Sequence, residues 1–134
     1  MGYMRVRVEH NVSHDVYVIA GSTRIDDEDD CKSFVRFFED QFAALGHKVD
    51  VIFVPGEFII EPAMVEPWGR ARQEVFDRFF GLSIRVVSDY DFSIDQATKA
   101  IKRKEVVSSA PDIETALVLI AHMRAQQSES DATA

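Results

Sequence analysis

The stretch DVYVIAGSTRIDDEDDCKSFVRFFEDQFAALGHKVDVIFV, residues 15–54, decides the fold of this chain. It begins with an apolar run over residues 15–20 that is typical of a β-strand and that Gly21 ends. Residues 47–54 have the same character and predict a second strand. Between them, apolar side chains recur at intervals of three and four, the spacing of one helix face, at Phe34, Phe37, Phe38, Phe42 and Leu45. Gly46 fits the left-handed position that closes such a helix.

A strand, a helix and a second strand within about 40 residues form a crossover unit, which predicts parallel pairing. Residues 3–9 alternate apolar and charged side chains, so they predict a half-exposed strand that forms an antiparallel hairpin with residues 15–20. Residues 82–88 predict a further strand of the crossover type. We therefore expect an α/β fold: a single three-layer domain with a mixed, mostly parallel sheet of four or five strands, helices on both faces and an N-terminal β-hairpin.

The second half of the chain predicts three more helices. The first begins near Pro67 and ends at Gly81, the second begins at Ser93, and the third begins at Pro111 and is apolar over most of its circumference. Residues 105–108 predict a brief edge strand. We place the folded domain at residues 1–125 and a flexible polar tail at residues 126–134.

Composition excludes several classes of protein. The 134 residues are 46% hydrophobic and 28% charged, which is ordinary for a globular domain. A net charge of −8 disfavours binding to nucleic acid. The sequence has no run of 18 apolar residues, so we expect no membrane span. Cys31 is the single cysteine and no apolar signal core precedes it, so we expect a cytoplasmic location without disulfides.

One candidate site follows the first crossover strand. Gly21-Ser-Thr-Arg24 lies between a predicted strand and a predicted helix, where many α/β proteins bind phosphate. The pattern resembles the flavin-phosphate loop of NADPH-dependent FMN reductases, and that resemblance implies anion binding by Ser22, Thr23 and Arg24. The five carboxylates within residues 26–30 would repel a phosphate, so an ordinary loop is the alternative, and we assign no cofactor.

A second candidate follows the strand at residues 82–88. Asp89-Tyr-Asp-Phe-Ser93 resembles the Asp-x-Asp-x-Thr start of haloacid-dehalogenase-like phosphotransferases. The resemblance implies that Asp89 attacks phosphorus, that Asp91 moves the proton and that both help to hold magnesium. In that family the motif opens the fold, whereas here it lies in the last third of the chain. The alternative is a strand-to-helix turn whose carboxylates bond to the local backbone.

The sequence predicts no metal site. A calcium loop that starts at Asp26 or Asp89 lacks the glycine at position six and the glutamate at position twelve. The histidines lie in separate places along the chain, with only His10 and His14 close in sequence, and no cysteine or acid cluster joins that pair.

The apolar, proline-rich segment over residues 55–65 leads to our first functional hypothesis. We expect a small binding or assembly protein that associates with a protein partner or with itself, as a homodimer, through this segment and the wide apolar face of the last helix. The residues expected to bind the partner are Phe58, Ile59, Ile60, Met64 and Val65.

The second hypothesis is a small enzyme that acts on a nucleotide, nucleoside or other phosphorylated metabolite. In open α/β sheets, ligands bind beyond the carboxyl ends of the strands. Parallel strands would gather residues 21–27, 55–61 and 89–91 at that edge. The candidate catalytic groups there are Glu57, Glu61, Asp89 and Asp91, with the three anion-binding residues beside them.

Overall fold

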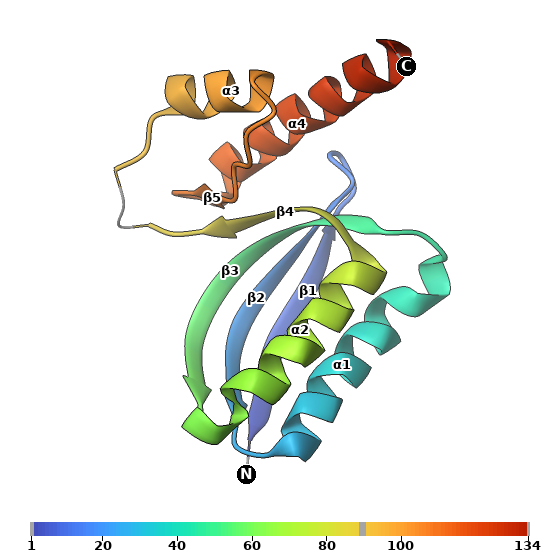
Figure 1. Cartoon of the computed structure of the whole chain (residues 1–134), viewed down its shortest axis with the longest axis vertical. Helices are drawn as coiled ribbons and strands as arrows, with labels where there is room; N and C mark the ends of the chain where they lie inside the picture. Colours follow the sequence, from blue (N-terminus) through green and yellow to red (C-terminus); the bar gives the residue numbers. More distant parts are fainter. Residues whose placement is uncertain (1, 89–90, 134) are drawn as a thin grey trace.

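The computed structural model describes residues 2–88 and 91–133. Its five-stranded sheet has the strands side by side in chain order, with β1 antiparallel to β2 and all later neighbours parallel (Figure 1). The strands are β1 (Tyr3–Asn11), β2 (Val16–Ile25), β3 (Val49–Ile60), β4 (Phe80–Val86) and β5 (Ser109–Ala110). The predicted mixed, mostly parallel sheet with an N-terminal hairpin is confirmed.

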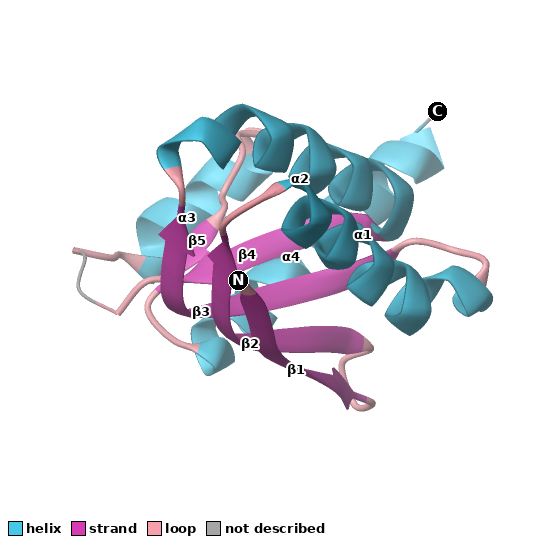
Figure 2. Ribbon diagram, turned by 90° about the horizontal axis from the view of Figure 1, so that it is seen from below, coloured by secondary structure: helices cyan, strands magenta, loops and turns pink. Residues whose placement is uncertain are grey.

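Helices cover both faces of this sheet, which confirms the predicted three layers. Figures 1 and 2 show one pair of helices on each side. On one face lie α1 (Glu28–Phe42) and α2 (Val65–Phe79), and on the other lie α3 (Ile94–Lys102) and α4 (Ile113–Thr133). Because α4 continues to Thr133, residues that the sequence predicts to be a flexible tail are helical.

The core has one cluster on each side of the sheet. Below α1 and α2, the aromatic stripe predicted from the sequence is buried at Phe34, Phe38 and Phe42, and it packs against β2, β3 and β4. Phe42 is 1% exposed and its ring contacts those of Tyr17, Phe38, Phe79 and Phe80. The second cluster joins α3 and α4 to the opposite face and is built from smaller aliphatic side chains.

The acidic run after β2 starts helix α1. The Asp27 carboxylate accepts a hydrogen bond of 2.9 Å from the amide of Asp30, and the Asp30 carboxylate accepts from the amides of Asp26 and Asp27. This reciprocal arrangement is a capping box, and it satisfies amide groups that the first helical turn leaves free. Cys31 follows in the first turn and is buried as a small core residue.

Two strands extend differently from the sequence-based expectation. Gly21 does not end the first crossover strand, because β2 continues to Ile25. Gly21 has a φ of +148°, and a Cβ there would lie 2.1 Å from the carbonyl oxygen of Arg5 on β1. Glycine is therefore required by the close approach of β1. Gly81 likewise lies within β4, which begins directly after α2, and β5 is residues 109–110 rather than 105–108.

A polar network fixes α4 to the amino-terminal ends of the strands. The Arg124 guanidinium donates to the Asp50 carboxylate at 2.8 Å and to the carbonyl oxygens of His14 and Asp15. The other oxygen of Asp50 accepts a hydrogen bond of 2.8 Å from the amide of Leu82. One carboxylate thus connects the last helix, β3 and the start of β4.

Candidate functional site

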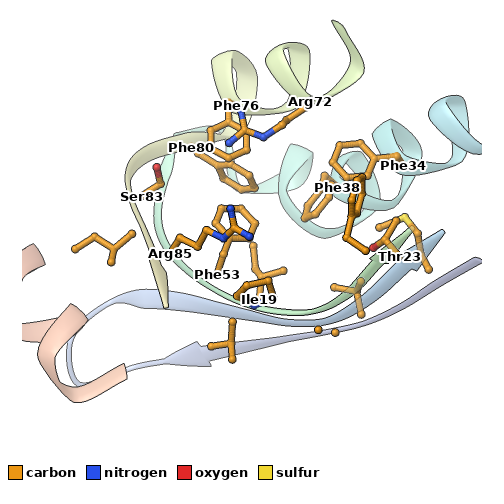
Figure 3. A pocket seen from close by; sticks show the side chains of 18 of the residues that line it. Ile19, Thr23, Phe34, Phe38, Phe53, Arg72, Phe76, Phe80, Ser83 and Arg85 are labelled. Atoms are coloured by element: carbon orange, nitrogen blue, oxygen red, sulfur yellow. The ribbon is translucent and has the colours of Figure 1, made fainter. Parts of the chain in front are cut away.

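A pocket of about 490 Å³ lies between the sheet and α2 (Figure 3). It exists because β4 separates from β3. Strands β2 and β3 stay paired to Ile25 and Ile60, whereas β3 and β4 pair only as far as Phe53 and Arg85. The far half of β3 therefore lacks a neighbour on that side, and α2 passes over the open wedge.

A β-bulge in β4 directs the side chains on one wall. Val49 pairs with Phe80 and Val51 with Ser83, so β4 has one extra residue in this interval. A bulge shifts the alternation of the strand by one position. Phe80, Ser83 and Arg85 consequently face α2 together, which strict alternation would not allow.

A second bulge, in β3, shapes the opposite wall. Gly21 pairs with Pro55 and Thr23 with Phe58, so here β3 has the extra residue. The Ser22 hydroxyl accepts a hydrogen bond of 3.0 Å from the amide of Glu57 and closes the bulge. A Cβ on Gly56 would lie 2.5 Å from that hydroxyl oxygen, so only glycine fits. The bulge places Phe58 on the same face as Thr23.

Aromatic rings form most of the lining. Six of the ten phenylalanines and the single tryptophan line this pocket. On the β4 side, Phe53, Phe76 and Phe80 contact one another with ring centroids 5.0–5.6 Å apart. On the other side, Trp68 lies 4.8 Å from Phe58 and 5.9 Å from Phe34. These distances are typical of attractive ring pairs, so the walls are well packed.

Few polar groups reach the pocket. Its charged lining residues are Arg72, Arg85 and Glu57, and its hydroxyl groups belong to Thr23, Ser83, Ser108 and Ser109. The Arg72 guanidinium lies 4.1 Å from the centre of the Phe76 ring. In Figure 3, Arg85 extends from β4 back over the pocket beside Phe53.

Trp68 carries a donor without an acceptor. Its indole Nε1 is buried and makes no hydrogen bond with any residue in the described part of the chain. Buried donors are nearly always paired, and leaving one unpaired costs about 1–3 kcal/mol. Because Trp68 lines the pocket, a ligand or a water molecule in it is a natural source of the missing acceptor.

The structure places the predicted anion-binding residues inside strand β2 rather than in a loop. The Ser22 hydroxyl accepts the hydrogen bond from Glu57 that closes the bulge, and Arg24 forms an ion pair of 3.0 Å with Asp26. Thr23 points to the opposite face and lines the pocket. The four residues from Gly21 to Arg24 therefore do not present a row of free amides to a phosphate.

The described candidate acids lie in different surroundings. Glu57 lines the pocket, whereas Glu61 is exposed and uses its amide to extend the pairing with Ile25. Asp91 is exposed before α3, and Asp89 lies outside the described residues. Pairing of β2 with β3 brings residues 21–25 and 55–60 together as expected, whereas the third part of the predicted site, residues 89–91, lies mostly outside the described residues.

The predicted partner-binding segment is more regular than expected, since it comprises the end of β3, a short 3-10 helix (Pro62–Met64) and the start of α2. Phe58 and Val65 are 45% and 56% exposed. Ile59, Ile60 and Met64 are partly buried. On the last helix, Val118 is 46% exposed and lies beside Leu117 in a shallow groove.

Three histidines lie near one another at the end of the molecule opposite the pocket, although two of them come from the first hairpin and one from α4. His10 bonds to the Asp15 carboxylate at 2.9 Å, and His14 lines the shallow groove together with His122 of α4. Within residues 2–88 and 91–133, no group of three histidine, cysteine or acidic side chains is arranged to hold a metal ion.

Within the same ranges, no helix combines the length and the apolar character that crossing a membrane requires. No protein-family model matches the sequence, and no curated protein or solved structure is significantly similar to it.

Sequence reasoning missed Arg72, Arg85 and five of the six pocket phenylalanines as functional candidates, and it named the sixth, Phe58, only for binding a protein partner. Arg85 carried one visible signal, since it is the one charged residue in the apolar run from Leu82 to Val87. A charged residue between two buried neighbours indicates a strand face that is not fully covered. Arg72 gave no such signal, because exposed arginines are ordinary on helices.

Proposed function

We propose that this protein binds a small organic molecule with an apolar body in the pocket between β3, β4 and α2. The observation that carries the proposal is the concentration of six phenylalanines and the single tryptophan around one hollow of about 490 Å³. Ligand pockets typically have volumes of about 300–1,000 Å³ and mainly apolar walls with a few polar groups.

A hollow of this size is not a packing defect. Protein interiors are close-packed, and voids larger than a water molecule are few. Apolar surface that stays in water instead of being buried forgoes about 25 cal/mol per Å², so a ligand that covers these apolar walls gains that free energy. A ligand with an apolar body would cover these walls, and a polar atom on it would offer an acceptor to Trp68.

Binding is better supported than catalysis. The described lining contains one carboxylate, Glu57, and neither a histidine nor a cysteine. A general acid–base pair or an activated nucleophile needs at least two such groups within hydrogen-bond reach. The enzyme hypothesis is therefore weaker than the proposal of ligand binding. Its candidate catalytic groups are Glu57, Glu61, Asp89 and Asp91.

The single tryptophan makes the proposal directly testable. We expect phenylbutanol to change the fluorescence of Trp68 and to release heat in a calorimetric titration. Thr23→Phe should fill part of the pocket and weaken binding by about tenfold or more, because the ligand and the new ring compete for one space. Val106→Phe is the control, since Val106 is 91% exposed and lies outside the pocket. Equal affinity in the two variants, with both folded by circular dichroism, would contradict the proposal.

A second candidate is protein association through residues 58–65. The exposed fractions of Phe58 and Val65 favour it, because both are apolar and both belong to the segment where β3 passes into α2. We expect Val65→Ser to shift a self-association equilibrium in sedimentation velocity without changing stability. A strict monomer at high concentration, together with unaltered partner capture by the Val65→Ser variant, would exclude this candidate.

A further inference from the structure

Most arginines of this protein are already paired with carboxylates. Six form ion pairs, for example Arg78, whose guanidinium lies 2.9 Å from both Glu39 and Glu74, and Arg124, which lies 2.8 Å from Asp50. Within the described ranges, the arginines without a carboxylate partner are Arg5, Arg36, Arg72 and Arg85. Two of these four line the same pocket.

The positions of these two arginines are held by the fold. Arg72 is exposed, and its guanidinium lies 4.1 Å from the centre of the Phe76 ring, a cation–π contact that favours a position at the rim of the pocket. Arg85 is directed to the α2 face by the bulge in β4, and its amide bonds to the carbonyl oxygen of Ser108 at 2.8 Å. This bond brings the hydroxyl groups of Ser108 and Ser109 to the same end of the pocket.

The local charge is opposite to that of the whole molecule. The lining has two arginines and one glutamate, which give it a formal charge of +1, although the protein carries −8. Glu57 is exposed and is not within ion-pair distance of either arginine. Two guanidinium groups and three serine hydroxyls therefore offer donors that no acid of the described chain satisfies.

We infer that the ligand carries an acidic group, and that Arg72 and Arg85 hold this group while its apolar body lies among the aromatic rings. Guanidinium groups bind carboxylates and phosphates through charge-assisted hydrogen bonds, and they do so more strongly beside apolar walls that exclude water. This inference rests on the proposed function, because the arginines act on a molecule whose body occupies the pocket. The class of ligand is a small amphipathic organic acid.

Three probes that share one apolar body separate the contribution of the acidic group to binding from the contribution of the apolar pocket. Phenylbutanol, phenylbutyrate and phenylbutyl phosphate share the phenylbutyl group and differ only at the end. By calorimetry, both acids should bind about tenfold or more tightly than the alcohol, which is the effect of a charge-assisted hydrogen bond. The tighter of the two acids identifies the chemistry that the arginines suit.

Matched variants assign the effect to the two arginines. Arg72→Gln and Arg85→Gln should each lower the affinity for phenylbutyrate by about five- to tenfold. The affinity for phenylbutanol should change by no more than about twofold. Arg36→Gln is the control, because Arg36 is exposed, unpaired and outside the pocket, and its loss changes the net charge equally. It should leave both affinities unchanged.

Two results would overturn the inference while leaving the pocket in place. Phenylbutyrate could bind no more tightly than phenylbutanol, or Arg36→Gln could weaken it as much as Arg85→Gln does. If none of the three probes releases heat or changes the fluorescence of Trp68, the proposed function is itself contradicted, and the inference is overturned with it.

Discussion

Removing the ring of Phe42 tests the packing on which the pocket depends. Phe42 is 1% exposed and contacts four aromatic rings at centroid distances of 5.2–6.5 Å. Truncating such a residue removes its transfer free energy and leaves a cavity, so Phe42→Ala should lower the free energy of unfolding by about 3–5 kcal/mol. For a domain of this size, the midpoint of thermal unfolding should fall by roughly 10–18 °C. Urea denaturation with a constant m-value is the measurement.

Phe58→Ala is the matched control, because it removes the same ring from a side chain that is 45% exposed. Its contact with Trp68 is 4.8 Å, so the loss should be real but small, about 1 kcal/mol. If Phe58→Ala destabilises the protein as much as Phe42→Ala, or if Phe42→Ala costs less than about 1 kcal/mol, the assignment of Phe42 to the centre of the core is wrong.

Three further predictions concern the backbone, the thiol and the acid limb of stability. Gly21→Ala should destabilise the protein in urea by about 2 kcal/mol or more, since the new methyl group would collide with the Arg5 carbonyl oxygen. An unchanged midpoint would contradict the close approach of β1 to β2 at this residue. Burial, helped by neighbouring carboxylates, raises the pKa of the Cys31 thiol, so a thiol reagent should modify it only after unfolding; rapid labelling of the native protein would argue against this placement. The hydrogen bond from His10 lowers the pKa of Asp15 from its ordinary 3.8. Because the folded pKa is the lower one, this stabilisation is present above the ordinary value and is lost as the pH falls through the folded pKa. Asp15→Asn, which keeps a residue suited to its positive φ, should make stability less dependent on pH in that range, as measured by unfolding at several acidic pH values.

Local patterns in the sequence predict the layers of this fold well. The intervals between Phe34, Phe38 and Phe42 are set by one helix and one buried face, and the structure buries all three. Helix caps are also local features. Asp27 and Ser93 each accept a hydrogen bond from an amide only three residues further along the chain. Such features depend on neighbours along the chain, and those neighbours are visible in one sequence.

The pocket could not be predicted because it depends on register between distant strands. Gly21 looks like a strand terminator, yet it remains paired within β2, where the close approach of β1 leaves no room for a side chain. Pro55 and Gly56 look like a loop, but they belong to a bulge that Ser22 closes. The pairing of β4 with β3 ends at Phe53 and Arg85, and the charge of Arg85 indicates an uncovered strand face but does not mark this separation. The hypothesis of an acidic edge stays a prediction, because it includes Asp89, which lies outside the described residues.

The most direct test of the central claim is a crystal structure of the protein grown with phenylbutyrate. Our account predicts the phenyl ring among Phe53, Phe76 and Phe80, with the carboxylate within hydrogen-bond distance of Arg72 or Arg85. An empty pocket with the ligand bound elsewhere would contradict it. So would a structure in which β4 stays paired with β3 beyond Phe53 and closes the hollow.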